Sequence, residues 1–350
     1  MSLLRIRAPQ IRLLERLCNA AGVSGDEGEV RRIVLEAVKP YASEVRVDAL
    51  GSVLVRRAGR GRGRRPRVML DAHMDEVGLM LVEADGDGLY RFETVGGINP
   101  LHLLGKQVLV GVAHKPGVIG AGPIHLLGED ERLRRVEVEA MRVDLGPGGR
   151  AEVGERAVFA TRFRRSGQAL LAKAIDDRIG VATLIEILKE APENIDLCLA
   201  FSVQEEIHAR GAAAAAHVFE PELAFAIDST PANDLPAWDG SENSSYNTKL
   251  GQGPAIYSVD GRMLHDPGLV RLLQETAQEA GIPYQMRQSG GGSTDGAAIQ
   301  RARGGVRTVS VSVPHRYTHS PISLARIEDW NATLNLLHLA LRRITPDINF

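Results

Sequence analysis

The chain has 350 residues, 44% of them hydrophobic and 25% charged, with a formal net charge of -2 at pH 7. These values are near the average for soluble globular proteins, so they argue against intrinsic disorder and against a fibrous repeat. The charge is balanced, and no apolar run approaches the roughly 20 residues of a membrane-spanning helix. We therefore expect neither nucleic acid nor a membrane as a partner.

The two cysteines, Cys18 and Cys198, each lie in an apolar run that is typical of a buried element. A disulfide framework is therefore not expected, which is consistent with a reducing compartment. The N-terminal residues lack the apolar core and cleavage site of a signal peptide. We expect a cytoplasmic protein in which any bound metal is held by histidine and carboxylate side chains.

The N-terminal part of the chain predicts two amphipathic helices, over residues 8–22 and 26–41, and then a β-hairpin formed by residues 45–47 and 52–56. Residues 56–67 follow as an arginine- and glycine-rich stretch with seven arginines. This stretch could contact nucleic acid, but we interpret it as a solvated loop because the charge of the whole chain is balanced.

Between residues 77 and 163 the pattern changes to short β-type runs separated by Gly, Pro and Asp turns, with no long helix. We expect a small all-β domain inserted at residues 72–164. Its predicted strands cover residues 78–83, 89–93, 107–112, 136–143 and 155–160.

The rest of the chain alternates helical and strand-like segments, which favours an α/β fold with a mostly parallel twisted sheet flanked by helices. Residues 1–71 and 165–350 would be the two parts of this catalytic domain. The predicted helices cover residues 178–191, 209–218, 266–280 and 325–343, and the predicted strands cover residues 195–203, 223–228 and 307–313.

Side chains of the kind that bind metals follow four of the predicted strands, and a further acidic pair opens a predicted helix. The strands lead into His73 and Asp75, into Glu205 and Glu206, into Asp228 and into His319, and the acidic pair is Asp176-Asp177. In an open α/β sheet the carboxyl ends of the strands form a shared crevice, so these segments can converge although they are far apart in sequence.

Each of these residues has a simpler interpretation when it is taken alone. A single buried histidine is usually a hydrogen-bonded core residue, Asp176-Asp177 would usually cap a helix, and Glu205-Glu206 would usually be solvated. Their joint occurrence favours a metal site. Histidine and carboxylate donors without thiolates suit Zn²⁺, Co²⁺ or Mn²⁺. Five ligands exceed one open tetrahedral site, so two metals that share a carboxylate are expected, a pairing suited to hydrolysis.

The neighbouring carboxylates then acquire expected roles. Asp75 lies two residues after His73, close enough to accept a hydrogen bond from its second ring nitrogen and so to orient the imidazole. Glu205 and Glu206 are adjacent, so their side chains point in different directions in extended backbone. One of the two should bind metal and the other should act as general base.

These residues lie in segments that resemble the tetrahedral aminopeptidases, also called the glutamyl aminopeptidase family, among the dizinc exopeptidases. The matching segments are AHMDEVG (72–78), GVIGAGPIHLL (117–127), KAIDDRIG (173–180), VQEE (203–206), AIDST (226–230), GQGPAI (251–256), SGGGSTDGAA (289–298) and RYTHSP (316–321), and they occur in the order found in the family.

The resemblance implies a role for each candidate residue. It implies that His73 and Asp228 bind one ion, that Glu206 and His319 bind the other, and that Asp176 bridges them. It also implies that Glu205 is the general base, that Asp75 orients His73, and that zinc is the metal, with cobalt or manganese as alternatives. For the whole protein it implies that the β-rich insert serves dimerisation and that dimers build a tetrahedral dodecamer.

Three features depart from the family pattern or need a separate interpretation. His208 and Ala209 stand where many relatives have Gly and a larger apolar residue, which leaves the shape of that loop open. His315 is interpreted as a surface residue, with a place in the substrate pocket as the alternative. The glycine-rich residues 289–296 lack the features of a nucleotide-binding loop, so we expect a close backbone approach to the substrate, ending at a helix N-terminus.

The predicted function is therefore a metallo-aminopeptidase that releases N-terminal amino acids from short peptides. Another hydrolase on the same dizinc scaffold, such as a deacylase or a carboxypeptidase, is the first alternative. An endoglucanase-type glycosidase and a non-enzymatic binding module are weaker ones, because a glycosidase uses two facing carboxylates without paired metals and a structural site needs no base. The sequence does not decide which N-terminal residue is preferred.

Overall fold

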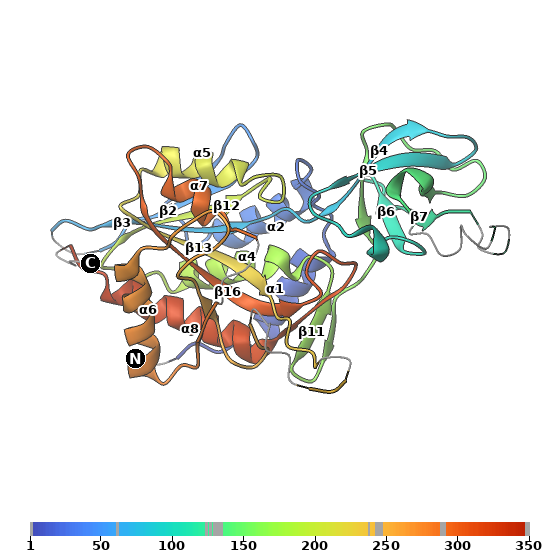
Figure 1. Ribbon diagram of the computed structural model, residues 1–350. Coiled ribbons are helices and arrows are strands. Elements are labelled where there is room, and N and C mark those ends of the chain that lie inside the picture. Colours follow the sequence, from blue (N-terminus) through green and yellow to red (C-terminus); the bar gives the residue numbers. More distant parts are fainter. Residues whose placement is uncertain are drawn as a thin grey trace.

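The computed structural model describes residues 3–60, 63–122, 125, 128, 136–236, 239–241, 248–287 and 292–346. Within these residues a large twisted sheet carries helices on both faces, and a small closed β-barrel lies beside it (Figure 1). The predicted fold class, an α/β sheet with a small all-β insert, is confirmed.

The large sheet is parallel at its centre and antiparallel toward its edges. β12 (Asp196–Ser202), β3 (Arg67–His73), β13 (Leu223–Pro231) and β16 (Arg307–Arg316) are its four adjacent parallel strands. The hairpin of β1 (Glu44–Val47) and β2 (Val53–Arg57) extends one edge, and β17 (Ser323–Arg326), β11 (Ala169–Ala172) and β10 (Arg164–Ser166) extend the other. Two short strands, β14 (Ala255–Ile256) and β15 (Gln285–Met286), join through β16.

Helices cover both faces of this sheet and bury the alternating side chains of its strands. One face carries α1 (Ala8–Asn19), α2 (Gly28–Val38), α4 (Ile175–Lys189), α6 (Pro267–Ala280) and α8 (Ile327–Arg343), and the other carries α5 (Arg210–Phe219) and α7 (Gly296–Gln300) (Figure 1). Val68 and Leu70 of β3 pack into the core on the first face, while Met69 packs into the core under α5. None of the described helices is long and apolar enough to cross a membrane.

The barrel has its own hydrophobic core and is reached from the sheet through the end of β3. Its strands follow one another around the barrel as β4 (Gly78–Ala84), β5 (Leu89–Val95), β8 (Arg142–Asp144), β7 (Lys115–Gly120), β6 (Gln107–Val110) and β9 (Arg156–Phe159). Leu81, Phe92 and Val110 are among the buried side chains that fill it. The short turns η1 (Pro100–His102) and η3 (Val138–Ala140) lie between its strands.

Most predicted helices and strands of the large sheet are found within a few residues of their expected bounds, but the barrel departs from the prediction in two places. A strand was predicted over residues 136–143, whereas residues 138–140 form a 3-10 turn and the strand covers only Arg142–Asp144. β7 was not predicted, because its Lys-Pro-Gly start is typical of a turn. Pairing with both β6 and β8 on closure of the barrel makes it a strand.

A buried ion network fixes two of the segments that carry candidate metal ligands. The carboxylate of Glu76 accepts hydrogen bonds from Lys173 Nζ at 2.6 and 2.8 Å and from Arg178 Nη2 at 2.9 Å. Lys173 also donates to the carbonyl of Ala20, and Arg178 to that of Met74, both at 2.8 Å. The network therefore joins the end of β3 and the start of α4 to the chain that follows α1.

Replacing Glu76 by Gln should lower the free energy of unfolding by about 3–5 kcal/mol, because two buried cations would lose their anionic partner. Urea unfolding followed by circular dichroism at a fixed protein concentration measures the change. The matched control is Glu83→Gln, since the Glu83 side chain is 61% exposed and, among the described residues, pairs only with Arg91. That variant should change the free energy by less than about 0.5 kcal/mol, and an equal effect of both substitutions would contradict the assigned role of Glu76.

Candidate metal centre

The carboxyl ends of the four parallel strands bring the predicted site residues together. His73 is the last residue of β3 and is paired with Ser202, the last residue of β12, so the loop that carries Glu205 and Glu206 starts beside it. Asp228 lies near the end of β13. His319 follows β16 by three residues. The expected convergence is therefore present at the carboxyl ends of the parallel strands.

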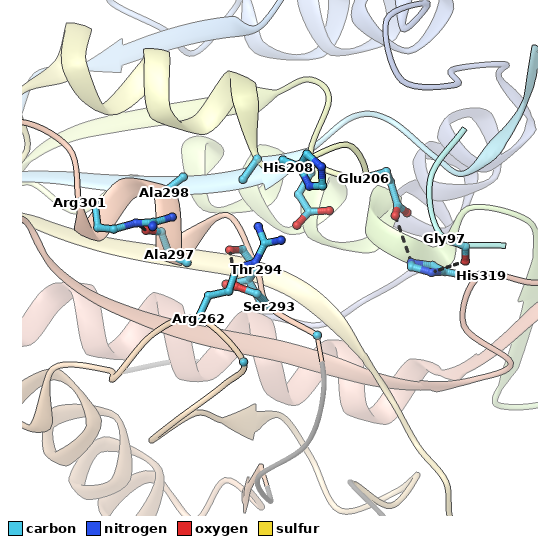
Figure 2. Close-up of a pocket in the computed structure, with 14 residues that line it drawn as sticks. Gly97, Glu206, His208, Arg262, Ser293, Thr294, Ala297, Ala298, Arg301 and His319 are labelled. Carbon is cyan, nitrogen blue, oxygen red and sulfur yellow. Dashed lines mark hydrogen bonds and ion pairs between the residues drawn. The ribbon is translucent and has the colours of Figure 1, made fainter. Parts of the chain in front are cut away.

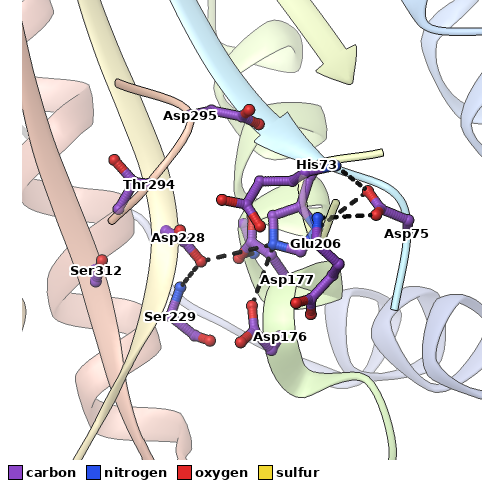
Figure 3. A network of polar contacts seen from close by, with 12 residues as sticks. His73, Asp75, Asp176, Asp177, Glu206, Asp228, Ser229, Thr294, Asp295 and Ser312 are labelled. Atoms are coloured by element: carbon purple, nitrogen blue, oxygen red, sulfur yellow. Dashed lines mark hydrogen bonds and ion pairs between the residues drawn. The ribbon is translucent and has the colours of Figure 1, made fainter. Parts of the chain in front are cut away.

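A first ligand group consists of His73, Asp176 and Asp228. Nε2 of His73 lies 3.2 Å from Oδ1 of Asp176 and 3.8 Å from Oδ1 of Asp228 (Figure 3). One ligand atom from each of the three residues lies within 4.8 Å of the others. Such a cluster of one imidazole and two carboxylates is a donor set that a divalent transition metal can use.

A second ligand group consists of Asp176, Glu206 and His319, whose ligand atoms also lie within 4.8 Å of one another. Nε2 of His319 lies 3.1 Å from Oε2 of Glu206 and 3.6 Å from Oδ2 of Asp176. Asp176 thus belongs to both groups, with Oδ1 toward His73 and Oδ2 toward His319. One carboxylate is placed between two donor sets.

In both imidazoles Nε2 faces Asp176, and Nδ1, on the other side of the ring, lies near an oxygen atom. Nδ1 of His73 lies 3.4 Å from Oδ1 of Asp75, and Nδ1 of His319 lies 2.9 Å from the carbonyl oxygen of Gly97 (Figures 2 and 3). Histidines that bind metals usually donate their second ring N–H to a carboxylate or a backbone carbonyl, which fixes the ring. His319 has this arrangement through the carbonyl of Gly97, and the carboxylate of Asp75 lies at ion-pair distance from Nδ1 of His73.

Asp75 also holds the loop that carries the two glutamates. Its Oδ1 accepts a hydrogen bond from the backbone N–H of Glu205 at 3.0 Å, and its Oδ2 accepts one from that of Glu206 at 3.2 Å. Ser24 Oγ donates to the same carboxylate at 2.6 Å. This buried carboxylate therefore connects His73 with the end of β12.

The loop after β12 turns sharply from Glu206 on, so the chain does not continue in the extended backbone that the sequence suggested. Gln204, His208 and Ala209 have φ angles of 60°, 90° and 54°. The N–H groups of His208 and Ala209 both donate to the carbonyl of Glu205 at 2.9 Å. Of the two glutamates, Glu206 belongs to a ligand group and Glu205 does not. The positive φ angles settle the open question of this loop's shape.

Burial raises the pKa values of several carboxylates of the site. Burial raises the pKa of Asp228 to about 7 and also raises that of Glu206. Burial is likewise the main cause that raises the pKa of Glu205 well above its usual range, and the nearby charge of Asp295 adds to it. So many buried acidic groups are unfavourable as anions unless cations compensate them.

The histidines respond in the opposite direction. Burial by itself would lower the pKa of His73 and of His319, but hydrogen bonds to carboxylates outweigh it. Asp176 and Asp228 raise the pKa of His73 well above its usual value, and Glu206 raises that of His319 to about 9. The carboxylates thus attract positive charge into the site, a role that bound metal ions fulfil more strongly. The types of donor atom, their burial and the shifted pKa values of these groups all fit a metal centre.

Three further predictions concern residues near the metal centre. His315 is buried, and its Nε2 lies 2.5 Å from Thr318 Oγ1, so its interpretation as a surface residue is wrong. It lies within β16, which continues three residues further than the predicted strand and so places this side chain in the core. His208 lines the cavity described next. Of the glycine-rich residues 289–296, the first three lie outside the described residues, while Gly292 and Ser293 line that cavity.

A cavity of about 410 Å³ opens beside the second ligand group (Figure 2). Glu205, Glu206, His319 and Gly97 line it together with residues from the loop before α6 and from α7. No sequence motif identifies Gly97, Ser24 or the two arginines of this cavity as site residues. Gly97 and Ser24 act through a carbonyl and a hydroxyl far along the chain, so no local motif identifies them.

Most of this chain matches one known protein family. Residues 51–336 match the model of the M42 glutamyl aminopeptidase family. The chain belongs to this family. The lysyl aminopeptidase of Pyrococcus furiosus is 32% identical over 348 residues, which cover 95% of this chain and 97% of that protein. The glutamyl aminopeptidase of Lactococcus lactis is 31% identical over 335 residues and 91% of each chain.

Solved structures of M42 relatives have the same fold. The TET aminopeptidase of a marine sediment archaeon of the Thaumarchaeota superposes with a TM-score of 0.91 at 32% identity, covering 97% of this chain and 98% of that one. The TET1 peptidase of Pyrococcus horikoshii, described as assembling into a tetrahedron or a large octahedral shell, gives a TM-score of 0.83 at 30% identity, covering 96% and 100% of the chains.

A structure from Thermotoga maritima that carries the name endoglucanase is also similar. Its TM-score is 0.76 at 28% identity, and the match covers 93% of this chain and 95% of that one. The M42 family consists of aminopeptidases, which are hydrolases, and its members are metallopeptidases. The two ligand groups of this chain are consistent with that membership.

Replacing Asp75 by Asn should weaken metal binding by about 10- to 100-fold, because His73 would lose its anionic partner and the loop of Glu205 and Glu206 one of its acceptors. Competition with a chromogenic chelator at fixed pH measures the affinity. Asp85→Asn in the barrel is the matched control, since Asp85 is exposed and pairs with Arg142. Equal affinities of wild type and Asp75→Asn would contradict the orienting role.

Proposed function

We propose that this chain is a metal-dependent aminopeptidase that releases the N-terminal residue of short peptides and uses two divalent metal ions. His73 and Asp228 would hold one ion, Glu206 and His319 the other, and Asp176 would bridge them. The observation that carries the proposal is the pair of ligand groups sharing Asp176 beside an open cavity, in a chain of the M42 family. Zinc is the proposed metal, and cobalt and manganese suit the same donors.

The chemistry divides between the metal ions and Glu205. Two such ions, when bound, polarise the scissile carbonyl and make a water acidic enough to attack it near neutral pH. Glu205 lines the cavity without belonging to a ligand group, and its raised pKa makes its carboxylate a competent proton acceptor. It would take the proton of the attacking water and deliver it to the leaving amine. Asp75 would keep His73 and the glutamate loop in place.

Two competing activities are less well supported. A glycosidase uses two facing carboxylates on either side of a sugar bond, whereas the carboxylates here gather around two imidazoles. A deacylase or carboxypeptidase would use the same donors but does not need a free N-terminal amine. The aminopeptidase names of the two M42 relatives support the requirement for that amine.

Replacing Glu205 by Gln should preserve metal binding while hydrolysis of aminoacyl p-nitroanilides falls by about 100- to 10,000-fold, because the proton acceptor is lost. Elemental analysis and kinetics, made after chelation and after adding back zinc, cobalt or manganese in turn, measure both effects. Glu15→Gln, an exposed position on α1, is the matched control. Near-normal turnover by Glu205→Gln would contradict the mechanism, and faster cleavage of N-acetylated than of free substrates would contradict the aminopeptidase assignment.

We further propose that the barrel mediates dimerisation and that dimers assemble into a tetrahedral dodecamer. Exposed apolar side chains on the barrel support this, among them Val112 at 85% exposure and Val153 at 60%. The assembly named for the Pyrococcus horikoshii relative is of the same kind.

Native mass spectrometry should therefore detect particles of twelve chains. Replacing Val112 by Glu should shift them toward smaller species, because a charge would be placed in an apolar contact. Val47→Glu on β1 is the control, since Val47 is exposed on the edge strand away from the barrel. A stable monomer of the wild-type chain would contradict the proposal.

A further inference from the structure

The cavity beside the metal centre has a basic end that the proposed mechanism does not use. Glu206 and His319 lie at one end, and Arg262 and Arg301 extend into the cavity from the other side (Figure 2). Arg262 lies in the loop between β14 and α6, and Arg301 directly follows α7. The two arginines come from segments far apart in sequence and reach the same space.

Neither guanidinium is neutralised within the described part of the chain. The side chain of Arg262 has no hydrogen bond or ion pair there, and only its backbone N–H is bound, to Oδ1 of Asp260 at 2.8 Å. Arg301 donates from Nε to the carbonyl of Ala297 at 2.9 Å and has no carboxylate within 4.0 Å among the described residues. Arg16, by contrast, pairs with Glu36 at 2.6 Å.

The space between the arginines and the metal centre suits a substrate side chain. Its volume, about 410 Å³, lies in the range of about 300–1,000 Å³ that is typical of small-ligand pockets. Gly261 and Gly292 form part of its wall, and the N–H of Gly261 donates to the carbonyl of Gly292 at 2.9 Å. A Cβ added at Gly261 would lie only 2.8 Å from that oxygen, so this wall has no room for a side chain.

The charges of the cavity select one class of side chain. A guanidinium binds a carboxylate through two parallel hydrogen bonds, and it repels the ammonium group of a lysine. The acidic residues at the other end are assigned to metal binding and to proton transfer. The unpaired positive charges are thus left for the substrate.

We propose that Arg262 and Arg301 bind the side-chain carboxylate of an N-terminal glutamate or aspartate, so that the enzyme prefers peptides with an acidic first residue. This inference rests on the proposed aminopeptidase function. The names of relatives leave the choice open, because one is a lysyl and another a glutamyl aminopeptidase. In this chain the two arginines favour an acidic first residue.

A substrate carries a second carboxylate that the arginines could bind, the C-terminal group of a dipeptide. Aminoacyl p-nitroanilides lack that group, so they report on the first side chain alone. Leucyl-alanine and its C-terminal amide differ only in that group, so comparing them shows whether the arginines bind the C-terminal carboxylate.

The test compares kcat/KM for glutamyl and glutaminyl p-nitroanilide, which differ in charge but hardly in shape. The wild type should prefer the glutamyl substrate, and the ratio should fall by about 10-fold in Arg262→Gln or Arg301→Gln and by about 100-fold in the double variant. Arg262→Lys should fall between wild type and Arg262→Gln, and Arg262→Glu should shift preference toward lysyl p-nitroanilide. Raising the salt concentration should lower the wild-type ratio.

Arg271→Gln on α6 is the matched control, because Arg271 is exposed and does not line the cavity. Its ratio should equal that of the wild type. Inhibition by free glutamate relative to glutamine, which measures binding without turnover, should follow the same order of variants.

Three outcomes would overturn the proposal in different ways. A wild type that cleaves lysyl or leucyl substrates better than glutamyl, or a ratio unchanged in the double variant, would overturn the specificity while the aminopeptidase function stands. A loss of preference for leucyl-alanine over its amide in Arg262→Gln, with the anilide ratio unchanged, would reassign the arginines to the C-terminal carboxylate. No cleavage of any aminoacyl substrate by the metal-loaded protein would overturn the proposed function itself.

Discussion

The position of Asp176 between two imidazoles is the constraint on which the rest of the site depends. Its two carboxylate oxygens face His73 and His319, so the two ligand groups can exist only while these three residues keep their places. Several buried carboxylates around them are costly as anions. Packing that fixes the surrounding backbone, and positive charge that compensates the acids, are both needed for such a cluster to persist.

The fold provides that fixed backbone from three sides. The parallel register of β12, β3 and β13 sets the positions of His73 and Asp228 along the strand direction. The ion network around Glu76 holds the start of α4, from which Asp176 extends. The barrel provides the third support, because the carbonyl of Gly97 orients His319. The all-β insert therefore supports the candidate metal centre as well as providing the proposed surface for dimerisation.

The cavity beside the metal centre is electrostatically divided. Its acidic end suits metal ions and the proton transfer proposed for Glu205, while the arginines at its other end line the space where we propose that the substrate side chain binds. In a family whose members carry names as different as lysyl and glutamyl aminopeptidase, such a division is a direct way to set specificity. The proposed reaction would depend on groups at strand ends, and the proposed selectivity on loops and helix ends that can vary without disturbing them.

The sequence by itself determined the alternation of strands and helices, the β-rich insert and the set of candidate ligands, because hydrophobic periodicity and strand-end positions are local properties. It could not place β7, whose Lys-Pro-Gly start becomes a strand only when its neighbours pair with it on both sides. It also misplaced His315, which is buried because β16 continues further than its apolar run. Which atoms face one another was decided only by the tertiary structure. The two oxygens of Asp176, the carbonyl of Gly97 and the side chain of Arg262 take their places from the packing of segments distant in the chain, and no local pattern encodes such packing.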